Sequence, residues 1–275
     1  MRQKHGRRSV IDEDLLLLGR PGIAWEALRR NIAYREVATR TEVTRSQLRK
    51  KPSLTVIEAD SSQQAEQWGL LFAERARPYQ RAAVFWCPDL DPSVLPVTVE
   101  SAVGRRMKDT ECIDFCKLDI AVTILKRPNR PEAILLCDGI HAIQIHIVDG
   151  TILNGPVVLN YQLRGFHWLK ERALTLQRLE GFQRHSRFLT KDFPSVGDAE
   201  RLLTALLAVD MRREGKFYRD IARHFLGEHA YREWTGRTDK HRSYVGRKLQ
   251  LGQRLIDGDY RKVLSPDADT LPKAV

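Results

Sequence analysis

Cysteine is scarce in this chain of 275 residues. The few cysteines are scattered, and their spacing fits neither a disulfide scaffold nor a paired CxxC metal clamp. We therefore expect reduced thiols, no bound metal and no other cofactor. The four cysteines are Cys87, Cys112, Cys116 and Cys137.

Long apolar runs are also missing from the sequence. No stretch approaches the roughly 20 apolar residues that a membrane-spanning helix requires. The basic start of the chain is followed by Asp12, Glu13 and Asp14 and then by only four leucines, which does not fit a signal peptide. The sequence shows no internal repeat and no glycine-rich phosphate loop. We expect a cytoplasmic protein without a membrane partner.

Positive charge, in contrast, is in excess. The chain has 46 Lys and Arg against 35 Asp and Glu, a net charge of +11 and a pI near 9.7. Its 42% hydrophobic content is typical of a globular protein, and its length allows two or three modules. Residues 201–265 hold 15 Lys and Arg against 8 Asp and Glu, so +7 lies in under a quarter of the chain. This concentration indicates a polyanion as partner.

Residues 240–256 have the pattern of an amphipathic helix. At 100° per residue the apolar side chains share about half of the circle, and we expect the single charge among them, Lys248, to extend its end into solvent. The other half is polar and basic, and the segment contains no Asp or Glu. Asp239 is the expected N-cap, and Gly258 with Asp259 is expected to end the helix.

Two more helices precede this segment and complete the outline of a helix-turn-helix. Residues 198–215 carry a stripe of leucines, and residues 217–227 carry a second apolar stripe at helical spacing. The insert at 227–238 is longer than a simple turn of three or four residues. We expect its Tyr231 and Trp234 to pack beside the motif.

The polar face of the last helix is suited to the DNA major groove. Arg can read guanine and Gln adenine, while Lys and Ser contact phosphates. A merely solvated helix is also polar on one side, but it usually mixes charges of both signs. Tyr218 and Arg219 are expected to touch phosphate, with core packing as the alternative for Tyr218. The expected DNA face comprises Lys240, Arg242, Ser243, Arg247, Gln250 and Arg254.

The rest of the chain predicts an α+β protein. Residues 23–36 predict an amphipathic helix with Trp25, Leu28 and Tyr34 inward. Residues 40–51 predict a loop or exposed helix. Asp-Gly and Asn-Gly pairs between the later apolar runs predict a small antiparallel meander. Helices are also expected at 62–77 and 166–189, and strands at 54–57, 82–86, 94–99, 119–125, 133–137, 142–148 and 156–163.

Four regions follow from this order of elements. We expect a small mixed N-terminal module at 1–105 and a β-hairpin region plus helix at 106–195. An all-helical helix-turn-helix region at 196–265 and a flexible tail at 266–275 complete the chain.

Three stretches carry a resemblance to a known family. Residues 24–31 read Ala-Trp-Glu-Ala-Leu-Arg-Arg-Asn, and residues 68–70 read Trp-Gly-Leu with Val-Phe-Trp-Cys-Pro at 84–88. The third stretch is the C-terminal part, with Asp-Gly-Thr at 149–151, Tyr-Arg-Asp-Ile-Ala at 218–222 and Gly-Asp-Tyr-Arg-Lys at 258–262. Together they are similar to proteobacterial regulators encoded on integrative and conjugative elements, best known as excision activators.

The resemblance has departures and implications. Ala27 and Ile32 stand where the family usually has Phe and Pro, and Asp259 replaces a usual Gly. The resemblance implies a transcriptional activator of genes for excision and transfer of a mobile element. It also implies control by a small antiactivator related to the C-terminal domain, and some relatives are made by frameshifting.

Two other functions stay open at this point. A tyrosine recombinase needs a nucleophilic tyrosine with arginines and a histidine, which Tyr260, Arg232 and His229 could supply, but residues 1–198 lack its long helical scaffold. A protein-binding module that sequesters a relative would not need the N-terminal region. We expect no enzymatic activity, and a nucleoid-associated regulator with double-stranded DNA as its partner. RNA polymerase is a further candidate partner, docking near Trp25 and Trp68 unless these are core aromatics.

Overall fold

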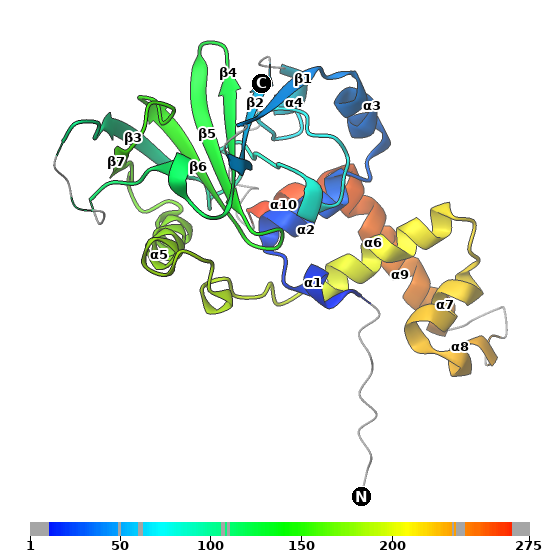
Figure 1. Ribbon diagram of the computed structural model, residues 1–275. Helices are drawn as coiled ribbons and strands as arrows, with labels where there is room; N and C mark the ends of the chain where they lie inside the picture. The colour runs from blue at the N-terminus through cyan, green and yellow to red at the C-terminus, as the bar shows by residue number, and fades with distance from the viewer. Residues whose placement is uncertain are drawn as a thin grey trace, which may run out of the picture.

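The computed structural model describes residues 11–48, 51–59, 63–105, 108, 111–232, 234 and 240–265. It places a sheet beside a layer of helices, from which a small helical lobe projects (Figure 1). This confirms the expected α+β class. The expected tail at 266–275 and the expected N-cap Asp239 lie outside the described residues.

A mixed sheet of seven strands forms one part of the molecule, in the order β1-β2-β4-β5-β6-β3-β7. β2 runs parallel to β4 and β3 parallel to β6, while the other neighbours are antiparallel. Because β1 to β3 precede residue 105 and β4 to β7 follow it, both parts of the chain build one sheet. The strands are β1 (Val43–Leu48), β2 (Lys51–Ala59), β3 (Leu95–Ser101), β4 (Ala121–Arg127), β5 (Arg130–Cys137), β6 (Ala142–Asp149) and β7 (Val157–Tyr161).

Each face of the sheet is covered by a different segment. The helix α5 (Leu169–His185) buries Leu179 and Phe182 against one face. Phe72 and Phe85, from the connection between β2 and β3, pack on the other face. Because successive side chains of a strand point to opposite faces, the covered strands carry apolar residues on both faces of the sheet.

Helices from both ends of the chain share the second core. α1 (Glu13–Leu16), α2 (Arg20–Leu28) and α3 (Ile32–Arg40) pack with α6 (Ala199–Arg213) and α10 (Tyr260–Leu264). Figure 1 shows the blue N-terminal helices beside the red C-terminal one. Trp25, Leu28 and Tyr34 are fully buried there, as expected. The two ends of the chain thus bury each other's apolar surface.

The projecting lobe contains the helices expected for the helix-turn-helix. α7 (Tyr218–Leu226) and α8 (Glu228–Arg232) pack against α6 and α9 (Lys240–Arg254). Ile221, Ala222 and Val245 are buried in this small core. The remaining elements are α4 (Gln63–Glu66), η1 (Tyr79–Arg81), η2 (Phe115–Lys117), η3 (Thr190–Asp192) and the π-helical turn η4 (Leu255–Asp259).

Several local expectations in the first hundred residues are wrong. The helix at 23–36 is two helices, because Asn31 caps α3 by accepting a hydrogen bond from the Tyr34 backbone N–H at 3.1 Å. Residues 40–51 hold the edge strand β1 rather than a loop or helix, and Arg45 on this strand pairs with the buried Glu74. That partner is 29 residues away, so local sequence could not reveal it.

The helix expected at 62–77 and the strand expected at 82–86 do not form either. α4 covers only Gln63–Glu66, and Gly69 then adopts a φ of +76°, which stops a helix. The apolar residues that follow are needed on the sheet surface, where Leu71 and Phe72 pack. In the 82–86 segment only Trp86 pairs, in an isolated bridge with Leu70.

The meander is confirmed for β4, β5 and β6 but not for β7. β7 pairs with β3, whose own partner on the other side is the parallel strand β6. The strand β3 from the N-terminal part is thus inserted between the last two strands of the expected meander. Hydrophobic alternation specifies which side of a strand is buried, but it does not specify the neighbouring strand.

Candidate DNA-binding interface

The position of α9 is determined by a close contact with α6. Gly252 is buried where the two helices cross, and a Cβ at this position would lie 2.4 Å from the Ala205 carbonyl oxygen. It would also lie 2.7 Å from a methyl carbon of Val209. Only glycine permits this backbone approach. The apolar half of α9 therefore faces α6, and its polar half faces away from α6.

The polar half is exposed as the sequence predicts. Fifteen residues of α9 contain no acidic side chain, and the expected DNA-contacting residues share one solvent-facing side. The exposed residues are Lys240, Arg242, Ser243, Arg247, Gln250 and Arg254. The exposed set thus includes three arginines and one glutamine, the side-chain types that can contact a base edge or a phosphate.

The arginines on this face differ in their partners. Among the residues that the structure describes, Arg242 and Arg247 have no ion-pair or hydrogen-bond partner for their guanidinium groups. Arg254 instead pairs with Asp259, with 2.7 Å between Nη2 and the carboxylate oxygen. Arg247 therefore stands as the least neutralised charge at the centre of the face.

Lys248 does not extend into solvent as expected. Its Nζ donates to the Thr204 hydroxyl of α6 at 2.5 Å and lies 5.0 Å from the ring centroid of Phe225 and 5.2 Å from that of Tyr244. Burial is the main cause that lowers the pKa of this lysine. The side chain thus turns inward because α6 offers an oxygen acceptor and two aromatic faces attract its charge.

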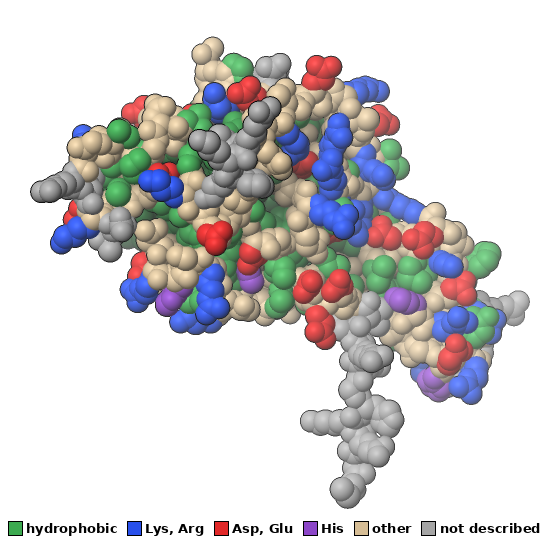
Figure 2. Space-filling model, in the orientation of Figure 1, with side chains coloured by type: hydrophobic (Ala, Val, Ile, Leu, Met, Phe, Trp, Pro, Cys, Tyr) green, Lys and Arg blue, Asp and Glu red, His purple; other side chains and the backbone are tan. Residues whose placement is uncertain are grey.

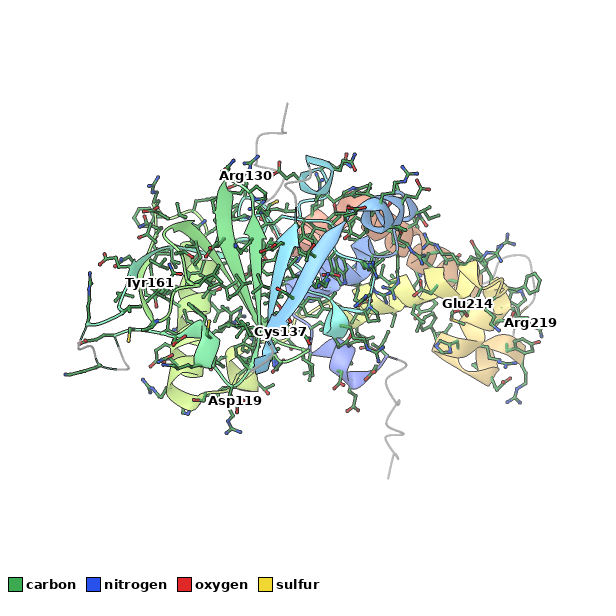
Figure 3. All side chains as sticks on the ribbon, turned by 45° about the horizontal axis from the view of Figure 1, so that its top comes forward. Asp119, Arg130, Cys137, Tyr161, Glu214 and Arg219 are labelled. Atoms are coloured by element: carbon green, nitrogen blue, oxygen red, sulfur yellow. The ribbon has the colours of Figure 1, made fainter. Side chains whose placement is uncertain are left out.

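Tyr218 and Arg219 at the start of α7 are both engaged within the lobe. Tyr218 is half-buried against the lobe core, with the guanidinium of Arg212 5.9 Å from its ring centroid. Arg219 donates to the Tyr231 carbonyl oxygen from Nε at 3.2 Å and from Nη2 at 3.1 Å, and it stacks on the Tyr231 ring at 3.7 Å. Figure 3 shows Arg219 at the outer end of the lobe. Their contact with phosphate stays a prediction.

The insert between α7 and α9 is described only in part. Trp234 packs against the lobe core, as expected, whereas the Tyr231 ring packs against Arg219 and Arg223 of α7. α8 occupies the first part of the insert, after Gly227 ends α7 with a φ of +88°. The described part of the insert therefore packs against α7 through the contact between Tyr231 and Arg219.

The N-terminal helices hold the far end of α9. The backbone bends at Gly258, whose φ is 155°, and continues as α10 rather than ending in a turn as expected. Asn31 donates from Nδ2 to the Ile256 carbonyl oxygen at 2.9 Å, and Arg30 pairs with Asp210 of α6 at 2.8 Å. Residues of the N-terminal Ala-Trp-Glu motif region thus fix both helices that set the orientation of the polar face.

The buried position of Tyr260 argues against a recombinase. Tyr260 is 1% exposed, and its hydroxyl donates to the Trp68 carbonyl oxygen at 3.0 Å. Burial raises its pKa, so the nucleophilic phenolate is disfavoured. Trp25 is fully buried and Trp68 half-buried in the same core, so both act here as core aromatics.

Other potential sites are less suited to chemistry. In the described part of the chain no group of three His, Cys, Asp or Glu could hold a metal. Burial raises the pKa of Cys87 to about 12 and that of Cys137 to about 11, which keeps both as inert thiols. None of the described helices is both long and apolar enough to cross a membrane.

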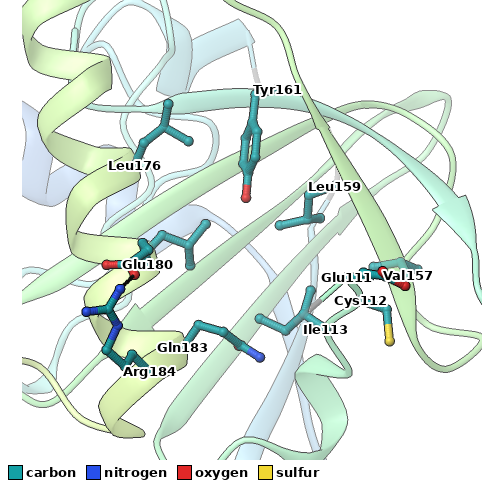
Figure 4. A pocket seen from close by; sticks show the side chains of 11 residues that line it. Glu111, Cys112, Ile113, Val157, Leu159, Tyr161, Leu176, Glu180, Gln183 and Arg184 are labelled. Carbon is teal, nitrogen blue, oxygen red and sulfur yellow. Dashed lines mark hydrogen bonds and ion pairs between the residues drawn. The ribbon is translucent and has the colours of Figure 1, made fainter. Parts of the chain in front are cut away.

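One sizeable hollow lies away from α9. It has a volume of about 790 Å³ and lies between α5 and β7 (Figure 4). Its floor is apolar, with Ile113, Leu159 and Leu176, and an ion pair between Glu180 and Arg184 borders it. Sequence reasoning did not anticipate this hollow, because its walls come from three separate segments.

Two family models match parts of the chain. Residues 166–265, from before α5 through α10, match a family described as "T6SS, Transcription factor, DNA binding domain". Residues 6–73 match a family described as "Proteobacterial transcriptional regulator-like domain". Both are families of transcriptional regulators and not of enzymes. No curated protein matches the chain.

The matched segments coincide with the two halves of the helical layer. α9 and its polar face lie in the matched DNA-binding domain, and α2, which packs against α6, η4 and α10, lies in the matched regulator-like domain. These matches indicate a transcriptional regulator with a DNA-binding domain in its C-terminal part.

Proposed function

We propose that this regulator binds specific DNA sequences by inserting α9 into the major groove. The observation that carries the proposal is the acid-free, exposed face of α9 directly opposite the Gly252 crossing. Arg247 and Gln250 at the centre of this face contact bases, and Lys240, Ser243 and Arg242 contact the backbone. Arg254 extends the contact at the C-terminal end of the helix.

The lobe supplies the second part of the interface. In a helix-turn-helix the helix before the recognition helix lies across the DNA backbone. α7 precedes α9 with the short α8 of the insert between them, and Arg219 is exposed at the start of α7. Arg219 and Tyr218 therefore contact phosphate in the proposed complex. Because Arg219 is already held against Tyr231, its guanidinium is preorganised for that contact.

We further propose that the protein acts at the nucleoid in the cytoplasm as an activator of genes for excision and transfer of a mobile element. The motifs shared with excision activators support this, as does the match to a regulator-like domain. RNA polymerase and a small antiactivator related to residues 166–265 are the proposed protein partners. Mapping the bound sites across the genome would show whether they precede such genes or other operons.

Binding of the purified protein to its own upstream DNA tests the core of the proposal. We would measure fluorescence anisotropy of a labelled upstream duplex and of a scrambled duplex over a range of salt concentrations. We expect tighter binding to the upstream duplex and a steep salt dependence. Arg247→Ala should weaken specific binding by about 1–3 kcal/mol, roughly 5- to 150-fold, for one lost base contact.

Arg187→Ala provides the matched control. Arg187 is an exposed arginine between α5 and η3, so the variant loses the same charge outside the α9 face. It should bind the upstream duplex as the wild type does. Equal and weak binding of the wild type to both duplexes would contradict sequence-specific recognition and favour a protein-binding module.

A further inference from the structure

The molecule presents a second basic surface outside the helix-turn-helix. Residues 74–81, between α4 and the end of η1, expose the side chains of Arg75, Arg77 and Arg81. We call this segment the arginine loop. Figure 2 shows Lys and Arg side chains gathered on the visible face over this part of the chain and α2.

Buried side chains of the N-terminal helices hold the backbone of the arginine loop. Trp25 donates from Nε1 to the Arg77 carbonyl oxygen at 2.9 Å, and the Tyr34 hydroxyl donates to the Glu74 carbonyl oxygen. The Glu26 carboxylate accepts from the Tyr79 backbone N–H at 3.0 Å. These hydrogen bonds fix the backbone of the loop before a ligand binds, so binding costs little backbone entropy.

The carboxylates near the arginine loop are neutralised internally. Glu74 is 1% exposed and pairs with Arg45 at 2.6 Å, and Glu26 is 2% exposed and pairs with Arg29 at 2.6 Å. In the described part of the chain the guanidinium groups of Arg75, Arg77 and Arg81 have no hydrogen-bond or ion-pair partner. Three uncompensated positive charges therefore project from one short rigid segment.

The composition of the arginine loop favours a phosphate backbone over a protein surface. Guanidinium groups match phosphate oxygens in charge and geometry. A protein interface normally adds an apolar centre to such charges. None of the large apolar side chains that are exposed in the described residues lies within 74–81.

The arginine loop and the polar face of α9 lie on opposite sides of the helical layer. α6 pairs with Arg30, just past the end of α2, through Asp210 on one side and contacts α9 through Ala205 on another side. In Figure 1 α9 passes behind α6, whereas the basic cluster of Figure 2 faces the viewer. One straight duplex lying on α9 would therefore not reach the loop.

We propose that the arginine loop binds the phosphate backbone of a second DNA duplex while α9 holds the first. The protein then bridges two segments of DNA. This inference rests on the proposed function of α9 for the first duplex. The second contact is independent of sequence, because phosphates carry no sequence information.

A duplex-capture experiment tests the bridge. The upstream duplex is immobilised and saturated with the full-length protein, and capture of a labelled 30-base-pair duplex of random sequence is measured at about 50–200 mM salt. The variant Arg75→Ala/Arg77→Ala/Arg81→Ala should bind the upstream duplex normally but capture at least about tenfold less of the second duplex. Three lost phosphate contacts should also reduce the slope of log K against log salt for capture by about 2.7.

A charge-matched triple variant is the control. Arg164→Ala/Lys170→Ala/Arg187→Ala removes the same charge from exposed positions in and beside α5. It should capture the second duplex as the wild type does. Equal loss in both triple variants would show only a net-charge effect and would overturn the proposal, as would unchanged capture by the loop variant.

Two further outcomes separate this inference from the proposed function. If Arg247→Ala leaves binding of the upstream duplex intact while the loop variant loses that binding, α9 is not the reading helix and the loop is the DNA surface. If the wild type captures no second duplex, and the loop variant instead fails to bind RNA polymerase, the surface is a protein contact and the bridge is wrong.

Discussion

The hydroxyl of Tyr260 donates a hydrogen bond to the carbonyl oxygen of Trp68 at 3.0 Å, although the two residues are 192 positions apart. The Tyr260 ring also lies 6.1 Å from the ring of Trp86. This contact joins the segment after α9 to the N-terminal part of the chain. The segments that match the two family models therefore pack against each other in one core.

Tyr260→Phe should lower the free energy of unfolding by about 0.5–1.5 kcal/mol, because one buried hydrogen bond is lost and the Trp68 carbonyl oxygen keeps no donor there. Urea denaturation of both proteins measures the difference. The folded variant should bind DNA with unchanged affinity. A complete loss of DNA-dependent activity in a fully folded Tyr260→Phe protein would revive the recombinase hypothesis.

The two glycines of α9 should respond in opposite directions. Gly252→Val places side-chain atoms against the Ala205 carbonyl oxygen and should destabilise the protein by about 1–3 kcal/mol through overpacking. Gly246→Ala meets no atom within 4 Å and should stabilise the helix by about 0.5–1 kcal/mol. Thermal and urea denaturation of the pair checks both signs. Equal effects would mean that α9 does not cross α6 at Gly252.

The ion pair of Arg254 with Asp259 should restrain DNA binding. Asp259→Asn frees the guanidinium and removes a negative charge next to the α9 face, so affinity for the upstream duplex should rise. The salt slope should steepen by about 0.9 if Arg254 then gains one phosphate. Asp198→Asn is the control, because it frees the exposed Arg201 from a similar 2.7 Å pair at the start of α6. A rise shared by both variants would point to net charge alone.

Acid should destabilise the protein through His146. Burial, reinforced by the charge of Arg127, lowers the pKa of His146 from 6.5 to about 4. Below about pH 6.5 the unfolded chain binds a proton that the folded chain does not accept until about pH 4. The free energy of unfolding should therefore fall on acidification across this window, by at most about 1.4 kcal/mol per pH unit from this group.

His146→Gln removes this contribution. The variant should lose less stability than the wild type between pH 7 and pH 5 in urea denaturation. Parallel stability profiles for the two proteins would show that His146 does not titrate differently in the folded and unfolded states.

Local sequence was sufficient for the helix-turn-helix and its polar face. The spacing of Val245, Gly252 and Ile256 predicts the buried side of α9, and the structure confirms it. Periodicity works here because each residue's side on an isolated helix depends only on its position in the turn. The same reasoning located the middle strands, whose turn residues are marked by Asp-Gly and Asn-Gly pairs.

Local sequence failed where a distant partner decides the conformation. Residues 62–77 look helical, but Leu71 and Phe72 leave the helix to cover the sheet, and β1 forms because β2 and Glu74 are available to it. The inward turn of Lys248 likewise depends on Thr204, 44 residues away. Contacts between distant segments override local propensity because the apolar burial they provide stabilises the fold more than local propensity does.

The sequence by itself thus determined the basic charge, the α+β class and the amphipathic helix that we propose as the DNA-reading element. Only the tertiary structure decided which residues surround that helix, because helix crossing at Gly252 and the packing of α2 on α10 join residues from both ends of the chain. It also decided that Arg75, Arg77 and Arg81 stand exposed on the side opposite α9. Their placement follows from the buried side chains of Trp25, Glu26 and Tyr34, which hold the loop by long-range hydrogen bonds that no local pattern encodes.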